Sequence, residues 1–259
     1  MNFLRIERDG AVTRLVLARV ETRNAFNAAM ISELTHALRT LSAEPELRIL
    51  VLAADGPTFC AGADANWMRE QKSVSEAENL ADAEKLFDLF RSVYEFPHPV
   101  IARVQGGAYG GGAGLICCSD IVVMSEDAQT GFTEVRLGIV PATISAFVLR
   151  KLGEGRAREL FLTGRRIGAA DCLRLGLANE VVPATELDNA VARWINELIL
   201  SGPTAQTMTK ELLREVPLFS LDQARTFTTQ RIARQRVSAE GQEGLSALLE
   251  KRPPSWSKA

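Results

Sequence analysis

The sequence predicts an α/β protein with a helical extension at its C-terminal end. Strand-like and helix-like patterns alternate as far as Pro183, and every later pattern is helical. Two short apolar runs, residues 48–54 and 100–104, suit strands that are covered on both faces of a sheet. Such alternation favours parallel strands joined by right-handed crossovers. We therefore expect a core over residues 1–196 and a helical oligomerisation region over 197–259.

The first half of the chain opens with a predicted hairpin. Residues 3–8 and 12–18 resemble strands, and Asp9-Gly10 between them is a turn-forming pair. Residues 28–43 place apolar side chains at helical spacing and predict an amphipathic helix. The other elements predicted in this half are a strand over 48–54 that ends at Asp55-Gly56-Pro57, a helix over 75–95 that ends before Pro97 and Pro99, and a strand over 100–104.

The second half begins with a helix predicted over 110–118, within a glycine-rich run. Strands are predicted over 121–124 and 177–182. The helices expected in this half, in chain order, span 143–152, 154–162, 169–175, 186–200, 204–215, 221–236 and 239–250. The tail from Arg252 to Ala259 is expected to be extended or frayed.

Composition excludes several classes of protein. A chain of 259 residues that is 46% hydrophobic can bury a large core. Its formal net charge of −2 gives no basic field for nucleic acid. No apolar run approaches the ~18 residues of a membrane span, and the N-terminus lacks the pattern of a signal peptide, so we expect a cytoplasmic protein without membrane contact. Four cysteines without CxxC spacing indicate reduced, buried thiols and no metal site.

Two segments of small residues are built to present bare backbone to a ligand. These are Cys60-Ala61-Gly62-Ala63-Asp64 and the glycine-rich run over residues 106–114. Each leads into a helix-like pattern, so the pair suggests two N–H groups that converge on one oxygen. Such an oxyanion hole stabilises charge that develops on a carbonyl. The glycines fit neither the dinucleotide fingerprint nor the ATP phosphate loop, which argues against both cofactors.

Taken in order along the chain, these and other segments resemble the crotonase superfamily of enoyl-coenzyme A hydratases and isomerases. The resemblance spans nearly the whole sequence and rests on the order and spacing of its motifs. The matching segments are Arg23-Asn24-Ala25-Phe26-Asn27, Phe59 to Asp64, Ile101 to Gly106 with the following glycines, Ser119-Asp120-Ile121, Phe132 to Pro141, Leu162-Thr163-Gly164 and Gly176-Leu177-Ala178. It implies a spiral of ββα turns, a C-terminal trimerisation region and an acyl-CoA thioester substrate.

The resemblance also implies roles for individual residues. The oxyanion donors should be the backbone N–H groups of Ala63 and Gly111, and Gly111 falls near the start of a helix whose dipole would reinforce them. Coenzyme A is part of the substrate, no other cofactor is implied, and the expected assembly is a trimer or a hexamer of paired trimers. Lys251 matches a position that reaches the nucleotide of a neighbouring subunit, and the other predicted substrate and coenzyme A contacts are Arg23, Ala25, Ala61, Asp64, Ala65, Asn66, Tyr109, Gly110 and Gly114.

The sequence retains one of two carboxylates that many hydratases of this superfamily carry. Gly114 occupies the position of the first, while Glu134 occupies the second. Glu134 would then activate water and return the proton to Cα itself or through water. A single glutamate also resembles Δ3,Δ2-enoyl-CoA isomerases, so the residues leave hydratase and isomerase open. A third alternative is a crotonase-fold protein that binds without catalysis.

Closer resemblance favours one hydratase activity. Residues 62–69, 101–106 and 133–142 are similar to bacterial 3-methylglutaconyl-CoA hydratases and their isohexenylglutaconyl relatives. This implies the reversible hydration of 3-methylglutaconyl-CoA to 3-hydroxy-3-methylglutaryl-CoA in leucine and isovalerate metabolism. The free carboxylate of that substrate would need a cation or several donors, and Arg69, Arg103 and Arg136 are the candidates that lie in or beside the motifs.

Overall fold

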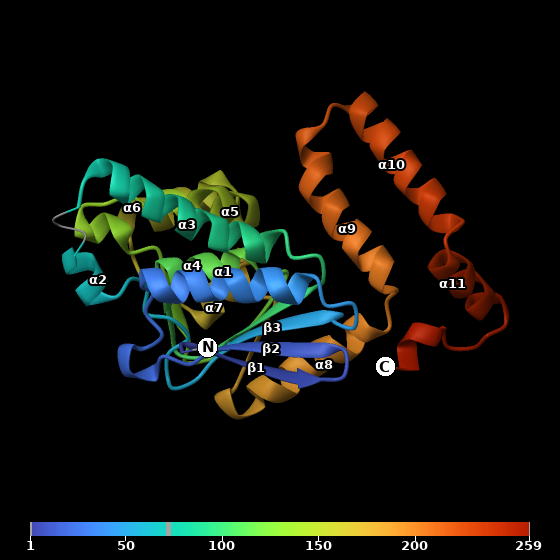
Figure 1. The fold of residues 1–259 in the computed structure, drawn as a ribbon, viewed down its shortest axis with the longest axis horizontal. Helices are drawn as coiled ribbons and strands as arrows, with labels where there is room; N and C mark the ends of the chain where they lie inside the picture. Colours follow the sequence, from blue (N-terminus) through green and yellow to red (C-terminus); the bar gives the residue numbers. More distant parts are fainter. Residues whose placement is uncertain (1, 71–73, 259) are drawn as a thin grey trace.

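The computed structural model describes residues 2–70 and 74–258. Its main sheet has strand order β1-β2-β3-β4-β6-β9, and Figure 1 labels the first three of these strands. β1 and β2 form the predicted antiparallel hairpin, and every other neighbouring pair is parallel. The strands are β1 Leu4–Asp9, β2 Val12–Leu17, β3 Ile49–Ala54, β4 Val100–Val104, β6 Ile121–Ser125 and β9 Glu180–Val182. The predicted α/β class is confirmed.

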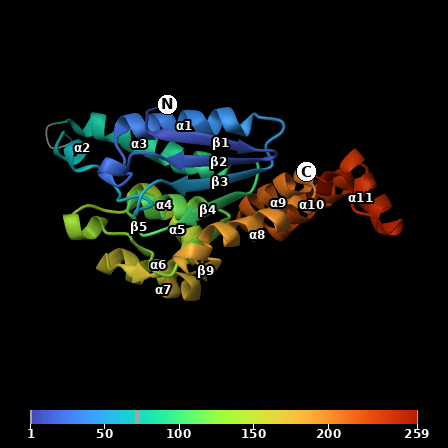
Figure 2. The same ribbon diagram turned by 90° about the horizontal axis from the view of Figure 1, so that it is seen from below.

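Helices cover both faces of this sheet, which accounts for its continuously apolar strands. Alternate side chains of β3 point to opposite faces. Leu50 and Leu52 belong to the larger core, whereas Ile49 and Val51 pack in a second core with α8. Figures 1 and 2 show α8 on one face of the sheet and the other core helices on the opposite face. The helices concerned are α1 Ala28–Ser42, α3 Glu76–Tyr94, α4 Gly111–Cys118, α5 Ala142–Leu152 and α8 Leu187–Ile199.

A second, smaller sheet was not predicted from the sequence. It has the order β5-β7-β8, with strands Gly107–Tyr109, Gln129–Gly131 and Ile167–Gly168. β5 and β7 are parallel, and the Thr130 hydroxyl donates to the Ala108 carbonyl at 2.6 Å. Segments of two or three residues carry no alternation that could reveal a strand. This sheet positions the candidate site.

The remaining helical elements agree closely with the predicted ranges. They are α6 Glu154–Thr163, α7 Ala169–Leu175, α9 Pro203–Glu215, α10 Leu221–Arg236 and α11 Ala239–Leu249. Helix α2, Ala65–Glu70, was missed, and β9 begins at Glu180 rather than Leu177. The expectation of an extended tail was wrong, because Ser255–Lys258 forms a 3-10 turn; Ala259 lies outside the described residues. Among the described residues, no helix combines the length and apolar character needed to cross a bilayer.

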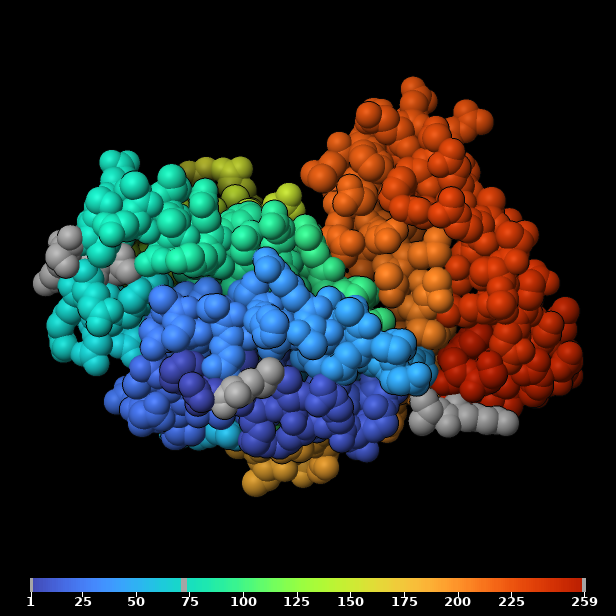
Figure 3. All heavy atoms as spheres, viewed as in Figure 1, coloured from blue at the N-terminus to red at the C-terminus, as the bar shows by residue number. Residues whose placement is uncertain are grey.

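Helices α9, α10 and α11 form a lobe at one end of the molecule (Figure 3). The helical C-terminal region is therefore confirmed, while a division at 196/197, which falls inside α8, stays a prediction. Several leucines of this lobe are largely exposed, as expected of a region that associates with other chains: Leu213, Leu218, Leu221, Leu248 and Leu249.

A buried ion pair attaches α9 to the core. Lys210 is 8% exposed, and its ammonium contacts Asp120 Oδ2 at 2.5 Å and donates to the His98 carbonyl at 2.9 Å. The same Asp120 oxygen accepts the Val100 N–H at 2.7 Å. A single carboxylate thus ties α9 to the start of β4.

We expect Asp120→Ala to lower the free energy of unfolding by about 3 kcal/mol, because it leaves the Lys210 ammonium buried without its carboxylate. The value lies at the low end for a buried pair since the Asp120 side chain is 33% exposed. Urea denaturation measures the change. The control Asp88→Ala, which removes an exposed pair with Arg91, should cost less than about 1 kcal/mol. Equal losses in the two variants would contradict the prediction.

Candidate active site

Three parallel segments bring the candidate residues together. β5 lies between β7 and a short bridge in which Cys60 pairs with Ala108. Cys60 N–H donates to the Gly107 carbonyl at 3.0 Å, and Tyr109 N–H donates to the Cys60 carbonyl at 2.9 Å. Because the segments run in one direction, the residues that follow each of them emerge at the same edge. Those residues are Ala61 to Ala63, Gly110 with Gly111, and Glu134.

The close approach of these segments requires small residues. A Cβ added to Gly112 would lie 2.7 Å from both the Cβ and the carbonyl oxygen of Cys60. Gly110 has φ +50°, a conformation that favours glycine. A Cβ on Gly110 would lie 3.4 Å from Glu134 Oε1 and 3.9 Å from the Gly62 Cα. The two glycine-containing segments and the carboxylate therefore meet at Gly110.

Two backbone N–H groups are left available at this edge. Phe26 N–H donates to the Gly62 carbonyl at 2.7 Å, and Asp64 N–H donates to the Phe26 carbonyl at 2.8 Å. The N–H of the intervening Ala63 has no acceptor within the described part of the chain. Gly111 is the first residue of α4, so its N–H has no partner in the helix and lies at the positive end of the helix dipole.

Glu134 supplies the carboxylate. It begins the 3-10 turn Glu134–Leu137, which ends at Gly138 with φ +75°. Its Oε2 is buried and has no hydrogen-bond partner among the residues described. Burial in these apolar surroundings raises the pKa of Glu134. A raised pKa suits a carboxyl group that must both take and return a proton.

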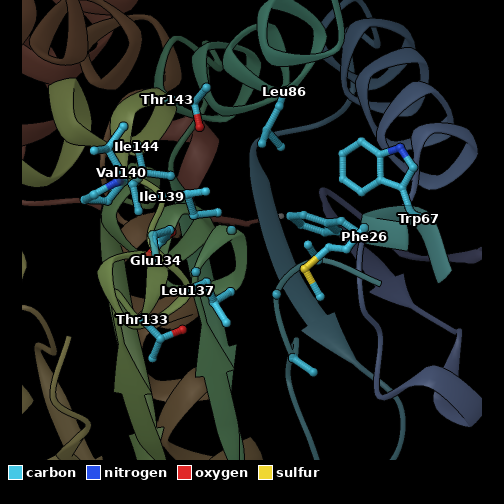
Figure 4. Close-up of a pocket in the computed structure, with 17 residues that line it drawn as sticks. Phe26, Trp67, Leu86, Thr133, Glu134, Leu137, Ile139, Val140, Thr143 and Ile144 are labelled. Carbon is cyan, nitrogen blue, oxygen red and sulfur yellow. The ribbon is translucent and has the colours of Figure 1, made fainter. Parts of the chain in front are cut away.

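These groups line one cavity of about 240 Å³. Figure 4 shows Phe26, Trp67 and Leu86 on one side and Glu134, Ile139 and Val140 on the other. Apart from Glu134, the side chains with polar atoms in the described lining are those of Thr133, Thr143 and Trp67. Among the described residues, the lining consists of Phe26, Ala61, Gly62, Ala63, Trp67, Met68, Leu86, Gly110, Gly111, Thr133, Glu134, Leu137, Ile139, Val140, Pro141, Thr143 and Ile144.

Gly114, expected to contact the substrate, is instead buried outside this lining, and that expectation is corrected. A Cβ added there would lie 2.6 Å from Ile144 Cγ2 and 2.9 Å from Phe90 Cε1. These two side chains fill the space into which a glutamate at position 114 would extend. Apolar groups therefore surround position 114, and Glu134 is the only carboxylate in the described lining.

Of the other predicted contacts, some line the cavity and the rest lie beside or behind it. Ala61 and Gly110 line the cavity, and Ala65 and Asn66 are exposed just beyond it at the start of α2. Arg23 is exposed, and its carbonyl accepts the Ala61 N–H at 3.0 Å. Ala25 is buried, and the buried Asp64 carboxylate accepts the Asn66 N–H at 2.7 Å. Ala25 and Asp64 thus support the loop and do not line the cavity.

Tyr109 and Lys251 lie away from the cavity in this chain. The Tyr109 ring packs against Arg166, whose guanidinium carbon lies 4.5 Å from the ring centre, and it is not in the described lining, so its contact with the substrate or coenzyme A stays a prediction. Lys251 is exposed after α11 in the C-terminal lobe, so any contact with the site would have to be made in a neighbouring subunit. Among the described residues, no cluster of His, Cys, Asp and Glu is placed to hold a metal ion.

Comparison with known proteins agrees with this architecture. The Enoyl-CoA hydratase/isomerase family profile matches residues 7–259. The chain belongs to this family. A Thermus thermophilus relative, provisionally named enoyl-CoA hydratase, is 36% identical and covers 95% of this chain and 98% of its own. The structure of an enoyl-CoA hydratase from Shewanella pealeana is 41% identical with TM-score 0.94, covering 98% and 96% of the two chains. Pseudomonas aeruginosa AtuE is 33% identical with TM-score 0.96, covering 98% and 99%.

Enoyl-CoA hydratase activity on a thioester is thus supported at the level of the family. The structure adds the apolar wall of the cavity, which the sequence did not assign to the site. Trp67, Leu86 and Ile144 come from α2, α3 and α5, and they meet Phe26 only through packing. Leu86 belongs to an amphipathic helix whose apolar positions also include Leu89, Phe90 and Val93, so the sequence does not single it out.

The raised pKa of Glu134 predicts a stability effect of Glu134→Gln. Below the ordinary glutamate pKa, near 4.3, the group is protonated in both the folded and unfolded states and burial costs no charge. As the pH rises through the raised folded pKa, the folded protein must ionise a desolvated carboxyl, and stability is lost. Glu134→Gln should therefore be more stable than the wild type at pH 8 and equally stable at pH 4. Urea denaturation at both pH values is the measurement, and a variant less stable at pH 8 would contradict it.

Proposed function

We propose that the protein catalyses the reversible hydration of an α,β-unsaturated acyl-CoA thioester in this cavity. The observation that carries the proposal is the meeting of Glu134 with the free N–H groups of Ala63 and Gly111. The two N–H groups bind the thioester oxygen and stabilise the charge that develops on it, an effect worth about 3–4 kcal/mol for each donor.

Glu134 then moves the proton. Its carboxylate removes a proton from water as the water oxygen bonds to Cβ, and the electron pair of the double bond passes to the thioester oxygen. The resulting enolate takes a proton at Cα from the Glu134 carboxylic acid, which restores the carboxylate. Because Gly114 supplies no second acid, both transfers fall to one group. The raised pKa of Glu134 suits this double task.

Glu134→Gln should lower kcat by about 10²–10⁴-fold, because the amide cannot take up the proton from water. Loss of absorbance at the conjugated thioester of crotonyl-CoA measures the rate. Affinity for a saturated acyl-CoA should be retained. A variant with full activity would remove Glu134 from the mechanism. A wild type that binds the thioester without converting it would favour a binding protein that lacks catalysis.

Isomerisation is the second candidate, and the packing around Gly114 favours it specifically. Movement of a double bond between the Δ3 and Δ2 positions requires one group that takes a proton at C2 and returns it at C4. The cavity offers one such group, and no carboxylate can be added at position 114 without displacing Ile144 or Phe90. Product analysis with a Δ3-enoyl-CoA separates the two activities.

The acyl group that we propose is 3-methylglutaconyl, which rests on resemblance in the sequence. None of the three candidate arginines lines the cavity. Arg103 donates to both Asp188 oxygens, at 2.8 and 2.9 Å, on the α8 face of the sheet. Arg69 donates to Asn66, and Arg136 donates to the Thr163 carbonyl. Within the described lining, Thr133 and Thr143 are the hydroxyl donors that a distal carboxylate would meet.

Two thioesters that differ only in this carboxylate test the acyl group. We expect 3-methylglutaconyl-CoA to be hydrated with a higher kcat/KM than 3-methylcrotonyl-CoA, because the threonine hydroxyls can donate to the extra acid. Chromatography of the hydroxyacyl products measures both rates. Faster turnover of the uncharged thioester would reject the glutaconyl substrate while leaving hydratase activity in place.

We also propose a homotrimer, or a hexamer of paired trimers. The exposed leucines of α9 to α11 support association, because contact with another copy would remove them from water. In such an assembly Lys251 could approach the coenzyme A of a neighbouring chain.

A further inference from the structure

A largely buried arginine, of intermediate exposure, lies behind the loop that presents Ala63. Arg19 follows β2, and its side chain is 13% exposed. Its Nη1 lies 2.8 Å from Asp64 Oδ2 and donates to the Ala25 carbonyl at 2.9 Å. The guanidinium carbon lies 5.5 Å from the centre of the Phe3 ring. An arginine with this many partners is fixed in place, and an ion pair at this depth is weakly screened.

The partner of Arg19 is the residue next to the proposed oxyanion donor. While Oδ2 of Asp64 contacts Arg19, Oδ1 accepts the N–H groups of Asn66 at 2.7 Å and Trp67 at 3.4 Å. Burial by itself would raise the pKa of Asp64, but these N–H groups and Arg19 outweigh it and the pKa is lowered. The carboxylate is therefore ionised, and it joins Arg19 to the first turn of α2.

The Asp64 carboxylate holds the loop one residue beyond Ala63, next to the hydrogen bonds that orient the peptide groups of Ala63. The Gly62 carbonyl and the Asp64 N–H both bond to Phe26, which fixes the peptide groups on either side of Ala63. Ala63, Ala65 and Asn66 are themselves exposed, so packing of their side chains contributes little to holding the loop. The anchor of the loop is instead Asp64, which is 5% exposed.

We propose that Arg19 is a positioning residue for the reaction: it holds Asp64 and thereby aims the Ala63 N–H at the thioester oxygen. The proposal rests on the proposed hydratase function. Arg19 does not line the cavity, so its loss should affect the charged enolate more than the ground-state thioester. A small misplacement of a donor is enough to reduce a rate by about 100-fold.

The test compares Arg19→Met, Arg19→Lys and Asp64→Asn with the control Asp188→Asn. The control removes a charge from another arginine–aspartate pair, Arg103 with Asp188, on the α8 face. We expect Arg19→Met and Asp64→Asn to lower kcat on crotonyl-CoA by about 10–100-fold with little change in KM. Arg19→Lys should recover part of the rate, and Asp188→Asn should keep the wild-type kcat. If Arg19→Met does not fold, kcat and KM of Asp64→Asn and Arg19→Lys are compared with those of Asp188→Asn instead.

Two ligands give a readout that a loss of stability would not produce. The enolate of acetoacetyl-CoA carries negative charge on the thioester side, whereas butyryl-CoA resembles the ground state. Titration followed by enolate absorbance should show weaker binding of the enolate to Arg19→Met and unchanged binding of butyryl-CoA. Equal effects on the two ligands, or a kcat no lower than that of Asp188→Asn, would overturn the inference, as would a wild type that does not bind the enolate. A wild type that binds the enolate but hydrates no thioester would reject the proposed function alone.

Discussion

The candidate site depends on the parallel alignment of three short backbone segments. The bridge at Cys60, strand β5 and strand β7 hydrogen-bond side by side and end at one edge. Each segment makes few hydrogen bonds by itself, because none is longer than three residues. Together they place the start of α4, the loop that contains Ala63 and the turn that contains Glu134 around one cavity. The larger sheet and its two apolar cores provide the rigid support for this arrangement.

Glu134 is placed where its charge is costly. One of its oxygens is buried with no hydrogen-bond partner in the described structure, and burial raises its pKa. In an ordinary core residue, a buried carboxylate oxygen without a hydrogen-bond partner would only reduce the stability of the fold. At a site for proton transfer, the same desolvation brings the carboxyl closer to the pH at which it works. The unpaired oxygen is therefore better explained by chemistry than by folding.

The packing at Gly114 limits the chemistry that this cavity can support. A Cβ at this position would already lie within 3.0 Å of Phe90 and Ile144, so a second carboxylate there would have to displace one of them. The apolar wall gives the acyl group a cavity in which few polar groups compete with Glu134 for a proton. On the other side, Asp64 and Arg19 hold the loop from behind. One side of the cavity thus carries the proposed acid–base group, Glu134, and the other carries a proposed oxyanion donor, the Ala63 N–H.

The sequence by itself determined the α/β class, most helix boundaries and the residues with chemical potential. Long amphipathic helices and continuous apolar strands leave a periodic pattern, and the two small-residue segments mark where backbone must be bare. It did not reveal β5, β7 or β8, since two or three residues have no period. The burial of Gly114 behind Ile144 and Phe90, and the packing of the Tyr109 ring on Arg166, are decided by neighbours from distant segments. The pairing of Arg19 with Asp64, and the wall formed by Trp67, Leu86 and Ile144, likewise depend on contacts between residues far apart in the chain. Only the tertiary structure fixes such contacts, because they result from the packing of whole elements and not from local preference.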